Sequence, residues 1–109
     1  MDKEFVKALI RRRRLQLIVH STIYYVLSDN IVSDDEWKEW AVELVDLQKR
    51  YPKIASEVEY HSEFQNFDHS TGYNLPIRTP WAIGTAMWLL RIRDKKVEEA
   101  NVSMGVRRS

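Results

Sequence analysis

The first quarter of the chain is free of the two residues that most readily interrupt a helix. No glycine or proline stands between residues 2 and 27. Apolar residues recur there at the spacing of one helical face, as in Phe5, Val6, Leu9 and Ile10. Four arginines interrupt this face, but their aliphatic stems can lie along apolar surface: Arg11, Arg12, Arg13 and Arg14. The pattern predicts one long helix over residues 2–27, with the arginines as the place where a bend or a break could fall.

A second helix is marked by its start. Ser33 and Glu36 form a capping box, in which each side chain satisfies a backbone N–H at the beginning of the helix. Asp34 and Asp35 favour the positive end of the helix dipole. Six apolar residues then form one stripe: Trp37, Trp40, Ala41, Leu44, Leu47 and Tyr51. We expect this helix to end at Pro52 and to form a helical hairpin with the first helix.

A third main helix is expected to begin at Thr79-Pro80, because threonine caps a helix and proline suits its first turn. It should run to about Ala100. The predicted fold is therefore all-α. A small single domain over residues 1–100 would hold three main helices, short helices and one ordered polar loop near residues 67–74. A flexible tail would follow over residues 101–109, and a leftover apolar face would allow a homodimer.

Composition excludes several classes of function. The 109 residues contain no cysteine, which excludes disulfides, thiol nucleophiles and every zinc site built on cysteine. No apolar run reaches the roughly 18–20 residues of a membrane span. The first residues lack the order of a signal peptide. We therefore expect a cytoplasmic protein with no membrane partner.

The formal net charge of +1 hides an uneven distribution of charge. Both ends of the chain are basic, and residues 29–68 are acidic. The basic ends, including Arg11 to Arg14, could bind nucleic acid or an acidic protein surface. One acidic face of the second helix could imitate nucleic acid toward a basic protein: Asp35, Glu36, Glu39 and Glu43. Charge runs of this kind are also typical of solvated helix surface.

The polar loop carries two candidate sites. Two histidines and an aspartate have the ligand types of a zinc or iron site, but not the spacing of a metal motif, so we expect no metal: His61, Asp68 and His69. Ser70, Thr71 and Gly72 could offer hydroxyls and a backbone N–H to an anion near Arg78. The structural alternative for these three residues is a turn closed by a hydroxyl, with Gly72 at a positive φ.

Aromatic and acidic residues gather at the junction of the first two helices. His20, Tyr24 and Tyr25 stand near the end of the first helix, and Asp34 opens the second. Aromatic faces and a carboxylate around one small pocket suit a cationic heteroaromatic ring. Tyrosines at a helix junction are also common core residues.

Four short segments of the predicted hairpin form a pattern: Tyr24-Tyr25-Val26-Leu27, Ile31-Val32-Ser33-Asp34-Asp35-Glu36-Trp37, Glu43-Leu44 and Tyr51-Pro52. This pattern, which covers about residues 20–52, resembles the N-terminal Ia domain of bacterial NAD-dependent DNA ligases. In those ligases, two helices and the turn between them hold the nicotinamide mononucleotide (NMN) half of NAD. The chain also looks like the short, ligase-related proteins carried by some bacteriophages.

The resemblance implies an NMN or NAD site at the hairpin, formed by His20, Tyr24, Tyr25, Asp34 and Trp37. Tyr24 matches the ligase tyrosine that packs on nicotinamide, and Asp34 matches the first aspartate of the ligase motif. Tyr25 takes the place of a histidine or tyrosine. Trp37 replaces a second tyrosine and keeps its aromatic face without the hydroxyl. Lys38 stands where the ligases have a second aspartate, so a cation replaces a carboxylate that would face the ligand.

The catalytic part of those ligases has no counterpart in this sequence. The ligases form an adenylate on the lysine of a Lys-x-Asp-Gly motif in a larger domain, and these 109 residues contain no such motif. We therefore expect a protein that is not an enzyme, carried by a phage, that binds a host protein of DNA metabolism or defence in the host cytoplasm. The alternatives are binding of NMN or NAD without catalysis, and nucleic-acid binding through the basic ends.

Overall fold

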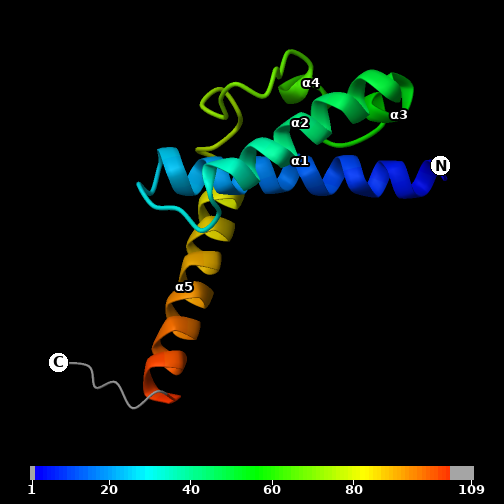
Figure 1. The fold of residues 1–109 in the computed structure, drawn as a ribbon. Coiled ribbons are helices and arrows are strands. Elements are labelled where there is room, and N and C mark those ends of the chain that lie inside the picture. The colour runs from blue at the N-terminus through cyan, green and yellow to red at the C-terminus, as the bar shows by residue number, and fades with distance from the viewer. Residues whose placement is uncertain (1, 104–109) are drawn as a thin grey trace.

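The chain folds into helices joined by turns and loops (Figure 1). A computed structural model describes residues 2–103, and no strand is present in that range. The helices are α1 Lys3–Tyr25, α2 Asp34–Arg50, α3 Pro52–Ser56, α4 His61–Phe64 and α5 Pro80–Ser103. The all-α prediction is confirmed, with three main helices and two short ones. Of the predicted tail, residues 101–103 extend α5, and residues 104–109 lie outside the described range.

Helix α1 runs unbroken through the four arginines. It begins at the cap residue Asp2, whose carboxylate accepts a hydrogen bond from the Glu4 N–H. One face of α1 contributes four residues to the main core: Val6, Ile10, Leu17 and Ile18. Arg14 stands on this same stripe and is also buried. The helix therefore needs no bend, because the core accommodates the arginine that interrupts its apolar face.

The Arg14 guanidinium holds three segments together. Only 1% of Arg14 is exposed, and each of its five N–H donors has an acceptor. The Gln48 side-chain oxygen on α2 accepts two of the bonds, at 3.0 and 2.8 Å. Backbone oxygens of Ala55, Val58 and Glu59, near the end of α3, accept the other three, at 3.1, 2.9 and 2.9 Å. Burial lowers the pKa of Arg14, but arginine keeps its proton in proteins.

Helix α2 begins where the capping residues predict. The Ser33 hydroxyl oxygen accepts a hydrogen bond from the Glu36 N–H at 3.1 Å. The main core buries three residues of the predicted apolar stripe: Ala41, Leu44 and Leu47. The other three residues of the stripe are partly buried and pack against this core: Trp37, Trp40 and Tyr51. α2 lies along α1, with the short helices α3 and α4 beyond it (Figure 1).

Helix α5 packs by its first turns only. The Thr79 hydroxyl caps it by accepting from the Ala82 N–H at 3.1 Å. Ala82 joins the main core, and Ala86 forms a second cluster with Val19 and Ile23 of α1. The rest of α5 runs away from the other helices (Figure 1). Several large apolar side chains on it are exposed: Trp81, Met87, Trp88 and Val97.

The structure also bears on membrane insertion. Between residues 2 and 103, no helix has both the length and the apolar character that crossing a bilayer requires.

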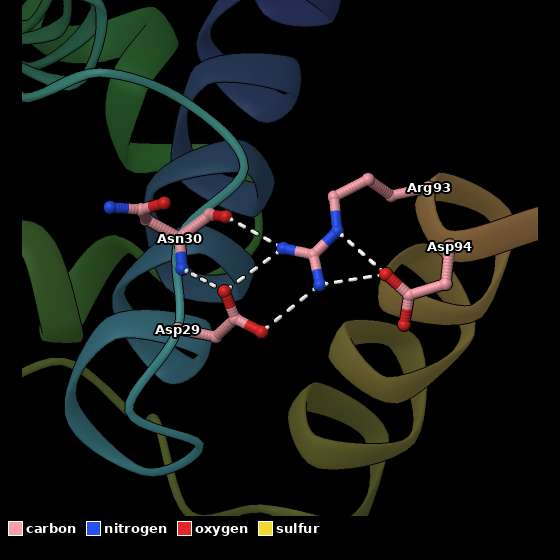
Figure 2. Close-up of polar contacts among 4 residues, drawn as sticks. All are labelled: Asp29, Asn30, Arg93 and Asp94. Carbon is pink, nitrogen blue, oxygen red and sulfur yellow. Dashed lines mark hydrogen bonds and ion pairs between the residues drawn. The ribbon is translucent and has the colours of Figure 1, made fainter. Parts of the chain in front are cut away.

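Arg93 joins α5 to the turn between α1 and α2 (Figure 2). Its two terminal nitrogens donate to the two carboxylate oxygens of Asp29 at 2.9 and 3.1 Å, and one also donates to the Asn30 carbonyl at 2.9 Å. Asp94 accepts from the same guanidinium. The hydrogen bonds from Arg93 lower the pKa of Asp29. Arg93 therefore fixes the turn that follows α1.

Candidate functional site

A pocket lies where α1 ends, α2 begins and the chain returns from α4. Its volume is about 240 Å³. All five residues predicted to hold a nicotinamide nucleotide line it: His20, Tyr24, Tyr25, Asp34 and Trp37. The wall is completed by Ser21, the turn residues 30–33, Lys38 and the loop residues 69–72. The structure thus brings the predicted residues together, while the ligand itself stays a prediction.

The two tyrosines at the end of α1 differ in how firmly they are held. Their rings meet edge to face, with centroids 4.9 Å apart. The Tyr25 hydroxyl lies 2.8 Å from the Thr71 hydroxyl, and the Tyr25 ring packs edge to face against Tyr73. Tyr24 is 56% exposed. Tyr25 therefore ties α1 to the loop, and Tyr24 presents an aromatic surface that a ligand could cover.

His20 lies on the same wall and is more enclosed. Its ring centroid is 5.3 Å from that of Trp40. Its Nδ1 atom is buried and has no hydrogen-bond partner among residues 2–103. Burial lowers the pKa of His20, and the Glu36 carboxylate partly opposes this by raising it. His20 is therefore neutral at pH 7, so it does not repel a cationic ring in the pocket.

Helix α2 contributes the charged wall. Asp34 is the first residue of α2, and Lys38 follows one helical turn later. Between them, Trp37 donates its indole N–H to the Ser21 hydroxyl at 3.2 Å, which ties α2 to α1. A carboxylate and an ammonium group thus border one cavity beside aromatic rings.

Gly72 allows the loop to close the third wall. A Cβ at this position would lie 2.0 Å from the Ser21 Oγ and 3.2 Å from the Trp37 ring. Only glycine fits so close to α1 without a shift. The expected turn is present, because the Tyr73 N–H donates to the Thr71 hydroxyl oxygen at 3.1 Å. The expectation of a positive φ at Gly72 is wrong; the positive φ of this loop belongs to His69, at 66°.

The loop does not form the anion cradle considered from the sequence. The Ser70 N–H and hydroxyl both donate to the Asp68 carboxylate, at 3.0 and 2.6 Å, and these bonds lower the pKa of Asp68. The Arg78 guanidinium lies over the Tyr73 ring, 5.5 Å from its centroid, and does not line the pocket. An anion there would meet Asp68 and committed donors, so the structural alternative describes this loop better.

The metal-like set is dispersed. Within residues 2–103, no three His, Asp or Glu side chains gather as a metal site. His69 lines the pocket, and its Nδ1 is buried without a partner. His61 opens α4 and does not line the pocket.

The acidic face of α2 is exposed over most of its length. Asp35, Glu36 and Glu39 are exposed, whereas Glu43 is half-buried and pairs with Arg13 at 3.3 Å. A shallow depression on this face is lined by three acidic residues together with Lys38 and Val42: Glu39, Glu43 and Asp46.

The basic face predicted from the run of arginines is only partly present. The prediction is wrong for Arg14, because this side chain turns into the core. Arg11 pairs with Glu59 at 3.2 Å, and Arg13 pairs with Glu43. Arg12 is exposed. Most of the run is thus committed within the fold. At the basic C-terminal end, Arg91, Lys95 and Lys96 are exposed on α5 and Arg93 pairs with Asp29. Arg107 and Arg108 lie outside the described range.

The sequence reasoning missed that residues 69–72 belong to the pocket. The sequence predicts an ordered polar loop here, but the contacts of this loop with α1 join residues that are distant in the sequence. The single local signal is the glycine among Ser70, Thr71 and Tyr73, which marks a close approach without naming the partner.

About half of the chain is similar to DNA ligases. The DNA ligase of Thermosipho africanus is 38% identical over 56 residues, which cover 51% of this chain and 8% of the ligase. The DNA ligase of Pseudothermotoga lettingae is 32% identical over 75 residues, which cover 62% of this chain and 11% of the ligase. The DNA ligase of Carboxydothermus hydrogenoformans is 42% identical over 54 residues, which cover 50% of this chain and 8% of the ligase. No family model and no solved structure matches the chain.

These similarities correct one expectation. The relatives are named as DNA ligases, which are enzymes, so the expectation of a protein that is not an enzyme is contradicted. The chain spans only about a tenth of the length of these relatives. The resemblance to the ligase Ia domain and the phage origin stay predictions. What the comparisons support is a DNA ligase-related region that covers about half of this chain.

Proposed function

We propose that the pocket binds the nicotinamide mononucleotide half of NAD, and that this binding serves a ligase-type reaction. The observation that carries the proposal is the convergence of Tyr24, Tyr25, Asp34, Trp37 and His20 on one cavity. The similarity to DNA ligases supports the reaction class. In this proposal the pocket residues bind the nucleotide and do not carry out nucleotide transfer.

The chemistry of the walls suits a pyridinium ring. Such a ring is flat and cationic, so it stacks on an aromatic face and is attracted by that face's negative potential. The half-exposed Tyr24 ring offers that face, and the Asp34 carboxylate offers a counter-charge. A volume of about 240 Å³ lies just below the roughly 300 Å³ at which drug-sized pockets begin. It therefore suits the ring and its sugar better than a whole dinucleotide.

The proposal is tested by isothermal titration of the 109-residue chain with NMN and with NAD, up to about a millimolar ligand. We expect saturable binding of both. Tyr24→Ala and Asp34→Asn should each weaken it about tenfold or more, because each removes one of the two attractive groups. Glu39→Gln is the matched control, since Glu39 is exposed on α2 outside this pocket and its loss should leave binding unchanged.

Circular dichroism should show the same helix content in each variant. Absence of binding by the unaltered chain, or equal binding by the Tyr24 and Asp34 variants, would contradict the proposal.

A second candidate is an acidic surface on α2 that binds a basic protein, and the depression around Glu39 supports it. Val42 is 45% exposed within this acidic surround, which gives a partner both apolar area and charge. Glu39→Lys should abolish retention of a basic protein partner and leave NMN binding intact. Glu39→Gln should weaken the retention less. Retention that is unchanged in Glu39→Lys would contradict this candidate.

A further inference from the structure

Two opposite charges face the pocket without partners inside the protein. Asp34 and Lys38 both line the cavity. Across residues 2–103, the side chain of neither residue forms a hydrogen bond or ion pair with another described residue. Both are exposed to solvent. A ligand that carried one charge of each sign could pair with both.

The spacing of the two charges limits what that ligand can be. Residues four apart on a helix are neighbours on one face, with Cβ atoms about 5–6 Å apart. The aromatic rings of Tyr24 and Trp37 border the same cavity and favour a flat ligand. The complementary ligand is therefore a flat ring that carries its positive and negative charges on neighbouring parts of the same ring.

We propose that the pocket prefers a pyridinium ring bearing a carboxylate over one bearing a carboxamide. The preferred ligands are nicotinic acid riboside and its mononucleotide. Asp34 pairs with the ring cation, and Lys38 pairs with the ring carboxylate. The inference rests on the proposed function, because it takes the pyridinium site as given and specifies which substituent the site selects.

The carboxylate on the ring suits Lys38 better than a phosphate on the sugar does. Lys38 shares its helical face with Asp34, which faces the ring, so Lys38 also faces the ring. The ring carboxylate and the phosphate of a mononucleotide could nevertheless compete, because Lys38 is the one lysine or arginine that lines the described pocket. The experiment therefore uses ligands with and without the phosphate.

The test is a set of titrations followed by NMR with four ligands. The ligands are nicotinamide riboside, nicotinic acid riboside and the mononucleotide of each. The chain should bind the acid riboside about fivefold more tightly than the amide riboside, the upper range for an exposed ion pair. In Lys38→Met this preference should fall to about one. Lys38→Arg should keep most of it, and Lys49→Met, on the same helix but outside the pocket, should keep all of it.

The outcomes are separable. Equal binding of the acid and amide ribosides by the unaltered chain would overturn the inference and leave the proposed function standing. If Lys38→Met weakens the two mononucleotides equally and changes neither riboside, Lys38 holds the phosphate and the inference is wrong. If none of the four ligands binds, the proposed function fails together with the inference.

Discussion

Two polar residues of helix α1 differ in whether their buried side-chain atoms are hydrogen-bonded. Arg14 is buried with all five donors paired, and it joins α1 to α2 and to the end of α3. His20 stands six residues further on, and its buried Nδ1 has no hydrogen-bond partner in the part of the chain that the structure describes. Near it, Asp34 and Lys38 also lack partners in the described structure.

The difference separates a stabilising region from a binding region. A buried polar group costs free energy unless it is hydrogen-bonded, so full pairing at Arg14 favours one fixed arrangement of helices. The groups at the pocket keep their hydrogen-bonding and charge capacity for something else. We infer that the Arg14 region stabilises the arrangement of the helices, and that the C-terminal end of α1 forms a binding site on this scaffold.

The largest expected effect comes from Arg14→Ala. The change leaves three backbone carbonyls and the Gln48 side-chain oxygen without their donor. Each buried acceptor that is left unpaired costs about 1–3 kcal/mol. The free energy of unfolding of a small domain is only roughly 5–15 kcal/mol in total, so the variant should be partly unfolded. Urea unfolding followed by circular dichroism measures the loss. Arg12→Ala is the control and should change stability by less than about 0.5 kcal/mol. Equal effects of the two changes would break the comparison.

Gly72→Ala should give the next largest effect. Its Cβ would lie 2.0 Å from the Ser21 Oγ, so the loop has to move off α1, at a cost of about 1–3 kcal/mol. NMN binding should weaken with it, because the loop forms one wall of the pocket.

The matched control is Gly84→Ala on α5. A Cβ at Gly84 meets nothing within 4 Å, and alanine favours a helix, so stability should rise by about 0.5–1 kcal/mol. Thermal unfolding of the two variants should therefore shift in opposite directions. Shifts of the same sign would contradict the account of Gly72.

The pH dependence of stability should report His20. Its pKa is lowered in the folded chain because the ring is buried, so the unfolded chain binds the proton more readily. Stability is therefore full above the unfolded pKa of about 6.5 and falls as the pH drops below it. Urea unfolding at pH values from about 7.5 to about 5.5, one pH unit on either side of the unfolded pKa of about 6.5, measures this loss. His20→Gln should flatten the profile over this range, and an unchanged slope would assign it to another group.

Arg93→Ala should have the smallest effect. Its contacts with Asp29 and Asn30 lie at the surface, where salt screens ion pairs. We expect faster amide exchange in the turn 28–33 and little change at Arg14. Because Asn30 lines the pocket, NMN binding should weaken slightly. Slower exchange in the turn, or none of these changes, would show that Arg93 does not position it.

The sequence predicted the main helices well because their signals are local. Ser33 with Glu36 and Thr79 with Pro80 mark helix starts within a few residues, and both starts are observed. The apolar stripe of α2 is likewise confirmed.

The missed features depend on contacts that are distant in sequence. Four consecutive arginines look alike, and burial selects the one that follows Ile10 by four residues on the core stripe of α1. The sequence shows that Arg14 shares the helical face of Ile10. It does not show which carbonyls pair with Arg14, because they lie more than 40 residues away along the chain. The place of Gly72 against Ser21 also depends on the path of the whole loop.

The central claim is that the C-terminal end of α1 binds a pyridinium nucleotide while the Arg14 region serves as scaffold. It is tested most directly by mapping NMN binding on the backbone amides of the labelled chain, with NMN up to about a millimolar. The account predicts concentration-dependent shifts at residues 20–38 and 69–72, and none around Arg14, Ala55 and Val58. Shifts centred on the Arg14 region or on α5, or no shift at any amide, would contradict it.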